Sequence, residues 1–217
     1  MAISKRRSTF IGSILWVLCI QYYVVQVIVA MAWKIPYSIA QNTISDLGNT
    51  VCGAYGGRFV CSPLHGLMNF SFAVLGILMV AGSILISHSF HKSLAMRAAF
   101  SFIVIAGLGT SLVGIFPENT LRTFHIVGAA LPFVVGNLGL LWFGFIPRIS
   151  RALNYCALIF GLVSLLALIL FVTHHYVGIG IGGTERLVAY PQTVWLIIFG
   201  VYQLCEYLHY QHRMPLQ

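Results

Sequence analysis

The residues best suited to chemistry lie close together between positions 44 and 69. Only four of the 217 residues are acidic, and one of them, Asp46, lies here beside Ser45. Arg58 and His65 follow within the same stretch. Hydroxyl, carboxylate and imidazole groups are those that enzymes combine for nucleophilic and acid–base catalysis. The stretch 44–69 is therefore the first candidate for a functional site.

A hydrolase is one site that these residues could form. Either Ser45 or Ser62 would be the nucleophile, while His65 would act as its base and Asp46 would orient the histidine. The chain contains no Gly-x-Ser-x-Gly motif, however, and a serine next to an aspartate is also typical of a turn or a helix cap. A turn or a cap is the simpler interpretation of this pair.

A site for a divalent metal such as zinc is the second possibility. His65 and His125 each stand at the start of an apolar stretch and could supply two nitrogen ligands. Asp46 or Glu118 could add an oxygen, and a bound water would then ionise more readily and attack an ester or amide. His-Glu-x-x-His and paired Cys-x-x-Cys motifs are absent from the sequence, so spacing alone does not identify a metal site.

Membrane-spanning helices must position these residues. The chain is 59% hydrophobic and 7% charged, whereas about a quarter of the residues of a soluble domain are charged. A spanning helix needs roughly 20 mostly apolar residues. Stretches of this kind are found at 10–33, 63–87, 98–116, 125–146, 153–175 and 191–210. The sequence predicts one all-α domain over residues 1–217, with six transmembrane helices arranged as three hairpins.

The basic residues predict the orientation of these helices. Eight of the twelve Lys and Arg fall on the side of the N-terminus, namely Lys5, Arg6, Arg7, Lys92, Arg97, Arg148, Arg151 and Arg213. By the positive-inside rule both termini are expected in the cytoplasm, and the first apolar stretch is too long for a cleaved signal peptide. Helix ends near anionic lipid account for the net charge of +8, so nucleic-acid binding is not expected.

The three predicted outer loops share a pattern of charges. Each contains one acid and at least one arginine: Asp46 with Arg58, Glu118 with Arg122, and Glu185 with Arg186. Three local ion pairs could simply close the outer ends of the bundle. Polar groups at one level of a membrane protein can also line a shared pocket. Its ligand-binding residues would be Ser45, Asp46, Arg58, His65, Asn69, Glu118, Arg122, His125, Glu185 and Arg186.

Two further features of the outer loops affect this pocket. Cys52 and Cys61 lie in the first loop, an oxidising location, and could form a disulfide or remain free thiols. Residues 178–183 are rich in glycine, which permits close approach of the third loop to its neighbours and would bring Thr184, Glu185 and Arg186 over the bundle. Pro191 is then expected in the first turn of the last helix.

The order of several short motifs resembles a known family. The motifs are Ile-Ser-Asp-Leu-Gly at 44–48, Pro-Leu-His at 63–65, Met-Asn at 68–69, Phe-Pro-Glu at 116–118, His125 with Gly128, Gly-Gly-Thr-Glu-Arg-Leu at 182–187, and Tyr190-Pro191 with Trp195. With them the chain resembles the uncharacterised prokaryotic integral membrane proteins of domain-of-unknown-function family 998. It is also distantly similar to the Frag/DRAM/Sfk membrane proteins through the Ile-Ser-Asp stretch. The resemblance implies a six-helix membrane protein with its motifs on one face, but no activity, substrate or cofactor.

Three functions follow from these patterns. The first is an outer-leaflet pocket in the cytoplasmic (inner) membrane that binds a lipid headgroup or a small polar ligand, with membrane lipid as the expected partner. The second is a membrane-embedded hydrolase or transferase of such a lipid, with or without a metal, whose catalytic candidates are Asp46, His65, Glu118 and His125. The third is a non-catalytic membrane subunit whose outer ion pairs only stabilise the bundle.

Overall fold

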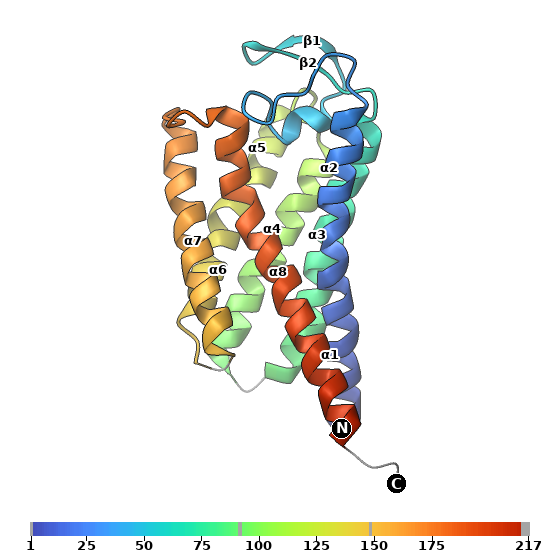
Figure 1. Cartoon of the computed structure of the whole chain (residues 1–217), viewed down its shortest axis with the longest axis vertical. Coiled ribbons are helices and arrows are strands. Elements are labelled where there is room, and N and C mark those ends of the chain that lie inside the picture. The colour runs from blue at the N-terminus through green and yellow to red at the C-terminus, as the bar shows by residue number, and fades with distance from the viewer. Residues whose placement is uncertain (1, 91–92, 148, 214–217) are drawn as a thin grey trace.

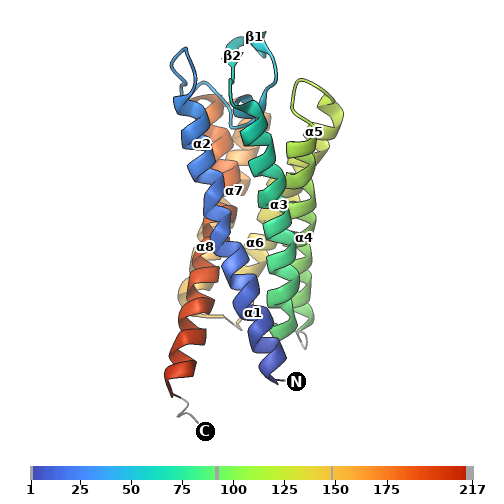
Figure 2. The ribbon, with the colours of Figure 1, turned by 90° about the vertical axis from the view of Figure 1, so that its right-hand side faces the viewer.

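The computed structural model describes residues 2–90, 93–147 and 149–213. Within these ranges, six helices are long and apolar enough to cross a membrane: Arg6–Met31, His65–Phe90, Leu94–Ile115, Arg122–Gly144, Arg151–Val172 and Gly180–His209. They lie side by side along the long axis of the molecule (Figure 1, Figure 2). The six predicted spans are confirmed, and the chain is a multi-pass integral membrane protein.

Some of these spans are built from several consecutive elements. The elements are α1 (Ala2–Val17), η1 (Leu18–Ile20), α2 (Gln21–Met31), η2 (Ser45–Gly48), β1 (Cys52–Tyr55), β2 (Arg58–Cys61), α3 (His65–Ser87), η3 (His88–Phe90), α4 (Leu94–Ile115), α5 (Arg122–Ala130), η4 (Leu131–Gly136), α6 (Asn137–Gly144), α7 (Arg151–Val172) and α8 (Gly180–Arg213). We call the end of the bundle that carries β1 and β2 the hairpin end. At the opposite, terminal end, α1 begins and α8 ends (Figure 1).

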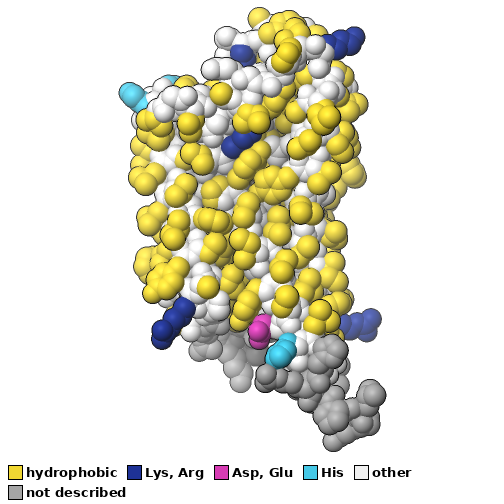
Figure 3. Space-filling view, in the orientation of Figure 1, with side chains coloured by type: hydrophobic (Ala, Val, Ile, Leu, Met, Phe, Trp, Pro, Cys, Tyr) yellow, Lys and Arg dark blue, Asp and Glu magenta, His cyan; other side chains and the backbone are white. Residues whose placement is uncertain are grey.

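The surface of the bundle suits a lipid environment. Large apolar side chains point outward along its length, for example Leu108, Leu166 and Ile169, which are more than half exposed. Hydrophobic side chains cover the visible face between the two ends, and the Lys and Arg side chains lie toward the ends (Figure 3). Because hydrocarbon offers no hydrogen-bond partners, the backbone groups of these segments must bond within the helices themselves.

Small residues allow the central helices to pack closely. A Cβ added at Gly76 of α3 would lie 2.3 Å from the carbonyl oxygen of Gly107 of α4. A Cβ added at Gly109 of α4 would lie 2.5 Å from the carbonyl oxygen of Gly128 of α5. Close contacts of this kind are typical of membrane helix interfaces, where packing drives association. The second contact holds the start of α5, which carries His125, against the end of α4.

The loop between α2 and α3, residues 32–64, departs from the expected all-helical chain. It contains an antiparallel pair of strands in which Cys52 opposes Cys61 and Tyr55 opposes Arg58. The two-residue turn is Gly56-Gly57, with φ of 56° and 79°. Paired glycines favour this turn because both positions need a left-handed backbone. The hairpin forms a cap at its end of the bundle (Figure 1).

The last helix also differs from its prediction. α8 begins at Gly180, so Glu185 and Arg186 are helical and Pro191 lies inside the helix instead of in its first turn. The glycines allow the close approach expected of them, although within a helix instead of a loop, because Gly182 donates its backbone N–H to the Ala40 carbonyl over 2.9 Å. The early start of α8 brings Glu185 into the interior of the bundle.

The fourth span contains an irregularity that the sequence analysis did not predict. Its middle, η4, is a π-helical segment that includes Pro132. Proline lacks a backbone N–H and disrupts regular helical bonding, and π-helical segments are frequent at functional sites. Phe133 and Val134 of this segment line the cavity described below.

Candidate functional site

Asp46 and Arg58 form the ion pair that connects η2 to the strand hairpin. Arg58 donates from Nε to one carboxylate oxygen of Asp46 over 2.6 Å and from an Nη to the other over 2.7 Å. The backbone N–H of Thr43 and the side-chain amide of Asn42 also donate to Asp46. Partial burial opposes the charge on Arg58, but the contact with Asp46 outweighs it and raises the pKa of the guanidinium. Asp46 is fully buried, and its carboxylate is committed to holding this cap in place.

Glu185 and Arg186 do not form the ion pair predicted for the third outer loop. Glu185 accepts the backbone N–H of Ile44 on one oxygen, and its other oxygen lies 3.3 Å from the Ser45 hydroxyl. Arg186 instead donates to the backbone carbonyls of Ile39, Asn42 and Gly182 and to the Tyr37 hydroxyl. Neighbouring residues on a helix point about 100° apart, so the two side chains face different partners.

Glu118 and Arg122 do not form the ion pair predicted for the second outer loop either. The Glu118 carboxylate accepts the side-chain amide of Asn49 over 2.8 Å. Burial, reinforced by the nearby charge of Asp46, raises the pKa of Glu118 to about 8. Arg122 is exposed at the start of α5 and makes no hydrogen bond or ion pair to any residue that the structure describes. At neutral pH Glu118 is therefore mostly uncharged. Arg122 is positively charged and forms no ion pair with a described acidic residue.

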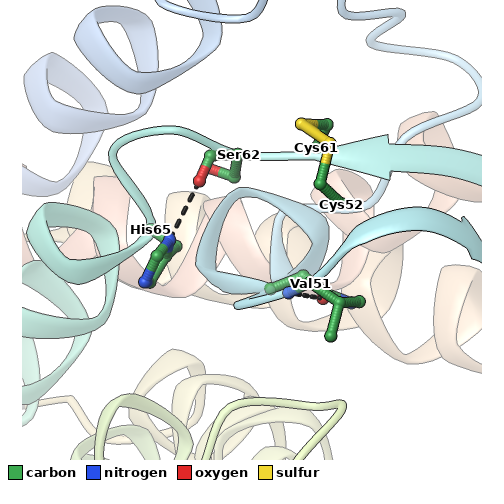
Figure 4. The surroundings of a disulfide bond; sticks show 6 residues. Val51, Cys52, Cys61, Ser62 and His65 are labelled. Atoms are coloured by element: carbon green, nitrogen blue, oxygen red, sulfur yellow. Dashed lines mark hydrogen bonds between the residues drawn. A yellow bond between two sulfur atoms is a disulfide. The ribbon is translucent and has the colours of Figure 1, made fainter.

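The side chain of Ser45 forms a hydrogen bond with a histidine of α5. The Ser45 Oγ lies 3.1 Å from Nε2 of His125, and Nδ1 of His125 lies 2.8 Å from the carbonyl oxygen of Phe116. The hydrolase expected from the sequence paired His65 with the hydroxyl of Ser45 or Ser62, but these hydroxyls bond to His125 and to the Leu47 carbonyl instead. His65 is half-buried at the start of α3, and its Nδ1 contacts the carbonyl oxygen of Ser62 over 3.0 Å (Figure 4).

A cavity of about 600 Å³ lies where the hairpin, α5, α7 and α8 meet. Its polar wall comprises Thr43, Ser45, Tyr55, Arg58, Glu118, Arg122, His125 and Glu185. Its apolar wall comprises Ile126, Ala129, Ala130, Phe133, Val134, Leu168, Ile169, Phe171, Val172 and Ile181. Ser45 and Glu185 also line a smaller cavity of about 50 Å³ farther inside the bundle, together with Thr110 and Gln192.

The predicted ligand-binding residues separate into two groups around this cavity. Those that line it are Ser45, Arg58, Glu118, Arg122, His125 and Glu185. Those that do not are Asp46, His65, Asn69 and Arg186. Asn69 has a structural contact instead, since its side-chain amide donates to the Gly48 carbonyl over 2.8 Å and holds η2 on α3.

The predicted metal ligands do not converge. No three His, Cys, Asp or Glu side chains of the described residues are placed to hold a metal ion. Asp46 is bound by Arg58, and both nitrogens of His125 are in hydrogen bonds. The set His65, His125 and Asp46 proposed for zinc is therefore not assembled in this structure.

Cys52 and Cys61 are joined by a disulfide at the base of the strand hairpin, so the sequence alternative of two free thiols is not adopted (Figure 4). The bond closes the short loop that carries Arg58. Cys19, Cys156 and Cys205 are free.

Sequence reasoning missed several contributors to this site. The apolar wall and Tyr55 carry no motif, and the acceptor for His125 is a main-chain carbonyl. Two signals for that acceptor were available: Phe116 begins the Phe-Pro-Glu motif, and it stands at the end of a predicted helix, where the last carbonyls lack helical partners.

The chain matches the family described as Protein of unknown function (DUF998) over residues 14–202. No curated protein and no solved structure matches it. The matched range includes all six spans at least in part, together with the whole α2–α3 loop and the residues of the cavity. The protein is a member of the DUF998 family of membrane proteins.

Proposed function

We propose that the protein binds an amphipathic ligand with an anionic headgroup, such as an acidic phospholipid, in the cavity at the hairpin end. The observation that carries this proposal is the lining of the cavity, in which polar side chains and a larger set of apolar side chains border the same space. Pockets for small ligands are mostly apolar and contain a few polar groups that fix the orientation of the ligand. A lipid with one acyl chain against α5 and α7 and its headgroup toward the hairpin would match both walls.

The charges of the polar wall favour an anion. Arg58 is neutralised by Asp46, Glu118 is mostly protonated at neutral pH, and the Glu185 carboxylate is buried and accepts the N–H of Ile44. Arg122 remains as an exposed cation at the start of α5, where the helix dipole adds positive potential. An arginine of this kind suits a phosphate or a carboxylate, to which it can donate two hydrogen bonds.

Native mass spectrometry of the protein purified in mild detergent tests this proposal. Phosphatidylglycerol should bind more tightly than phosphatidylcholine, and Arg122→Gln should weaken phosphatidylglycerol binding by about 10-fold, since a hydrogen bond to a charged group contributes about 1.5–3 kcal/mol. Arg97→Gln, which removes an exposed arginine at the start of α4, is the matched control and should leave binding unchanged.

Two further measurements identify which part of the ligand is bound. Ala130→Phe should fill part of the apolar wall and weaken binding of phosphatidylglycerol, while binding of soluble glycerol phosphate is kept. If the protein binds a soluble ligand instead of a lipid, glycerol phosphate should bind the wild type as tightly as phosphatidylglycerol does. Equal binding of both lipids to wild type and Arg122→Gln would contradict the proposal and favour a purely structural role for the outer charges.

We further propose that the hairpin end faces away from the cytoplasm of a prokaryotic cell, with both termini inside and the helices following one another as three hairpins. A disulfide is typical of an oxidising compartment, and Arg6, Arg97 and Arg151 stand at the starts of spans on the other side. After reduction, a membrane-impermeable maleimide should label Cys52 and Cys61 in intact cells. If the maleimide labels these cysteines only after cell lysis, the hairpin end faces the cytoplasm and the proposed orientation is wrong.

A further inference from the structure

Ser45 and His125 form a hydrogen-bonded pair on the wall of the cavity. They are 80 positions apart in the sequence, and their side chains meet because η2 lies over the start of α5. His125 is buried and is held on its other side by the Phe116 carbonyl. The pair thus has a fixed geometry and borders a space large enough for a substrate.

The hydrogen-bond partners determine where the proton of His125 lies. A carbonyl oxygen can only accept, so Nδ1 must carry the hydrogen that bonds to Phe116. In the neutral ring Nε2 then has a lone pair and can accept the single hydroxyl hydrogen of Ser45, for which the Glu185 carboxylate at 3.3 Å is the alternative acceptor. A hydroxyl directed at an imidazole whose other nitrogen is anchored is the arrangement that activates a serine nucleophile.

Glu185 completes the surroundings of this pair. One of its oxygens is fixed by the N–H of Ile44, and the other lies 3.3 Å from the Ser45 hydroxyl. In its ionised form this carboxylate would favour the positive charge that His125 acquires when it takes the serine proton. Glu185 would act through the pair and is therefore a positioning residue.

We propose that Ser45 is the nucleophile of an acyl-transfer reaction on an ester-linked lipid, with His125 as its general base. The inference rests on the proposed function, because the same cavity must hold the lipid. The Ser45 oxygen forms a bond to the ester carbonyl carbon while its proton moves to Nε2 of His125. The carbon–oxygen bond to the alcohol then breaks, and His125 returns the proton to the departing alcohol oxygen.

The acyl group left on Ser45 is removed by water. His125 takes a proton from the water, whose oxygen bonds to the acyl carbon. The bond from that carbon to the Ser45 oxygen breaks, and the serine recovers the proton from His125. The products are the free acid and the alcohol, and no metal or redox partner enters either step.

A fluorophosphonate probe, which reacts covalently with activated serines, tests this inference on the full-length protein in mild detergent. Mass spectrometry of the labelled protein should place the probe on Ser45. Ser45→Ala should abolish this labelling, and His125→Gln should slow it by about 100-fold or more, which is the usual contribution of a general base. Ser62→Ala, on the same loop but bonded to the Leu47 carbonyl, should keep it.

Separate measurements distinguish failure of this inference from failure of lipid binding. Monodisperse size-exclusion profiles for each variant show that loss of labelling is not loss of the fold. Binding of phosphatidylglycerol to the unlabelled wild type is measured separately by native mass spectrometry, and Ser62→Ala should keep both lipid binding and labelling. A folded wild type that binds lipid but leaves Ser45 unlabelled would overturn the acyl-transfer inference alone. Labelling of Ser45 at an unchanged rate in His125→Gln would overturn the role of His125.

Discussion

Glu185 and Arg186 are adjacent in the sequence, yet their side chains serve separate purposes. The Glu185 carboxylate accepts the N–H of Ile44 beside the cavity, whereas the Arg186 guanidinium is buried against the backbone carbonyls of Ile39 and Asn42. One turn of α8 thus supplies both a group at the candidate site and a clamp that holds the α2–α3 loop to the bundle.

Arg186→Gln should destabilise the protein strongly. The guanidinium donates to three backbone carbonyls and to the Tyr37 hydroxyl, and glutamine cannot satisfy all of these buried acceptors. Hydrogen bonds to a charged group contribute about 1.5–3 kcal/mol, so the expected loss in unfolding free energy is about 3 kcal/mol. Thermal unfolding in detergent measures the change.

Arg122→Gln is the matched control for Arg186→Gln, because Arg122 is exposed and should contribute little to stability. Equal melting temperatures for the two variants would show that Arg186 does not clamp the loop.

Asp46 and Arg58 should show strong coupling in a double-mutant cycle. Removing one partner leaves the other charge without its counterpart, and for a buried pair this costs about 3–5 kcal/mol. We expect Asp46→Asn to lie at or below the low end of that range, because the Arg58 side chain is 17% exposed. The double variant Asp46→Asn/Arg58→Gln should be less destabilised than the sum of the single variants, by about 1–3 kcal/mol. Additive losses in unfolding free energy would mean that the two residues stabilise the cap independently.

Glu118 should make the stability of the protein depend on pH. Its pKa is about 8 in the folded protein, above the ordinary value of 4.5, so the folded state binds more protons than the unfolded state between these values. The contribution of Glu118 is therefore complete below about pH 4.5 and is lost as the pH rises toward 8. Melting temperatures measured from pH 5 to 9 should fall through this window.

Glu118→Gln should remove that part of the pH dependence, because glutamine resembles the protonated acid. Its melting temperature should exceed that of the wild type above pH 8. Glu206→Gln, at an exposed position near the end of α8, is the control and should retain the wild-type profile. If Glu118→Gln also keeps the wild-type dependence of melting temperature on pH, Glu118 is not the source of that dependence.

The position of Asp46 next to Arg58 illustrates what sequence patterns could predict at the site. The two residues share one loop, so the loop can bring them together without help from the rest of the fold. Glu118 with Arg122 and Glu185 with Arg186 are equally close in sequence, but helix geometry and burial direct their side chains elsewhere. Proximity in the sequence therefore did not predict ion pairs where helix geometry or burial directs neighbouring side chains to different partners.

The sequence by itself determined the membrane class, the six spans and the concentration of polar motifs between them, because the hydrocarbon core imposes length and composition on each helix. It did not determine which histidine meets Ser45, since His65 is 20 positions away and His125 is 80. Only the tertiary structure decided in favour of His125, by packing α5 on α4 through Gly109 and Gly128 and by laying η2 across the helix ends. Contacts between distant segments depend on the packing of whole helices, and no local motif specifies them.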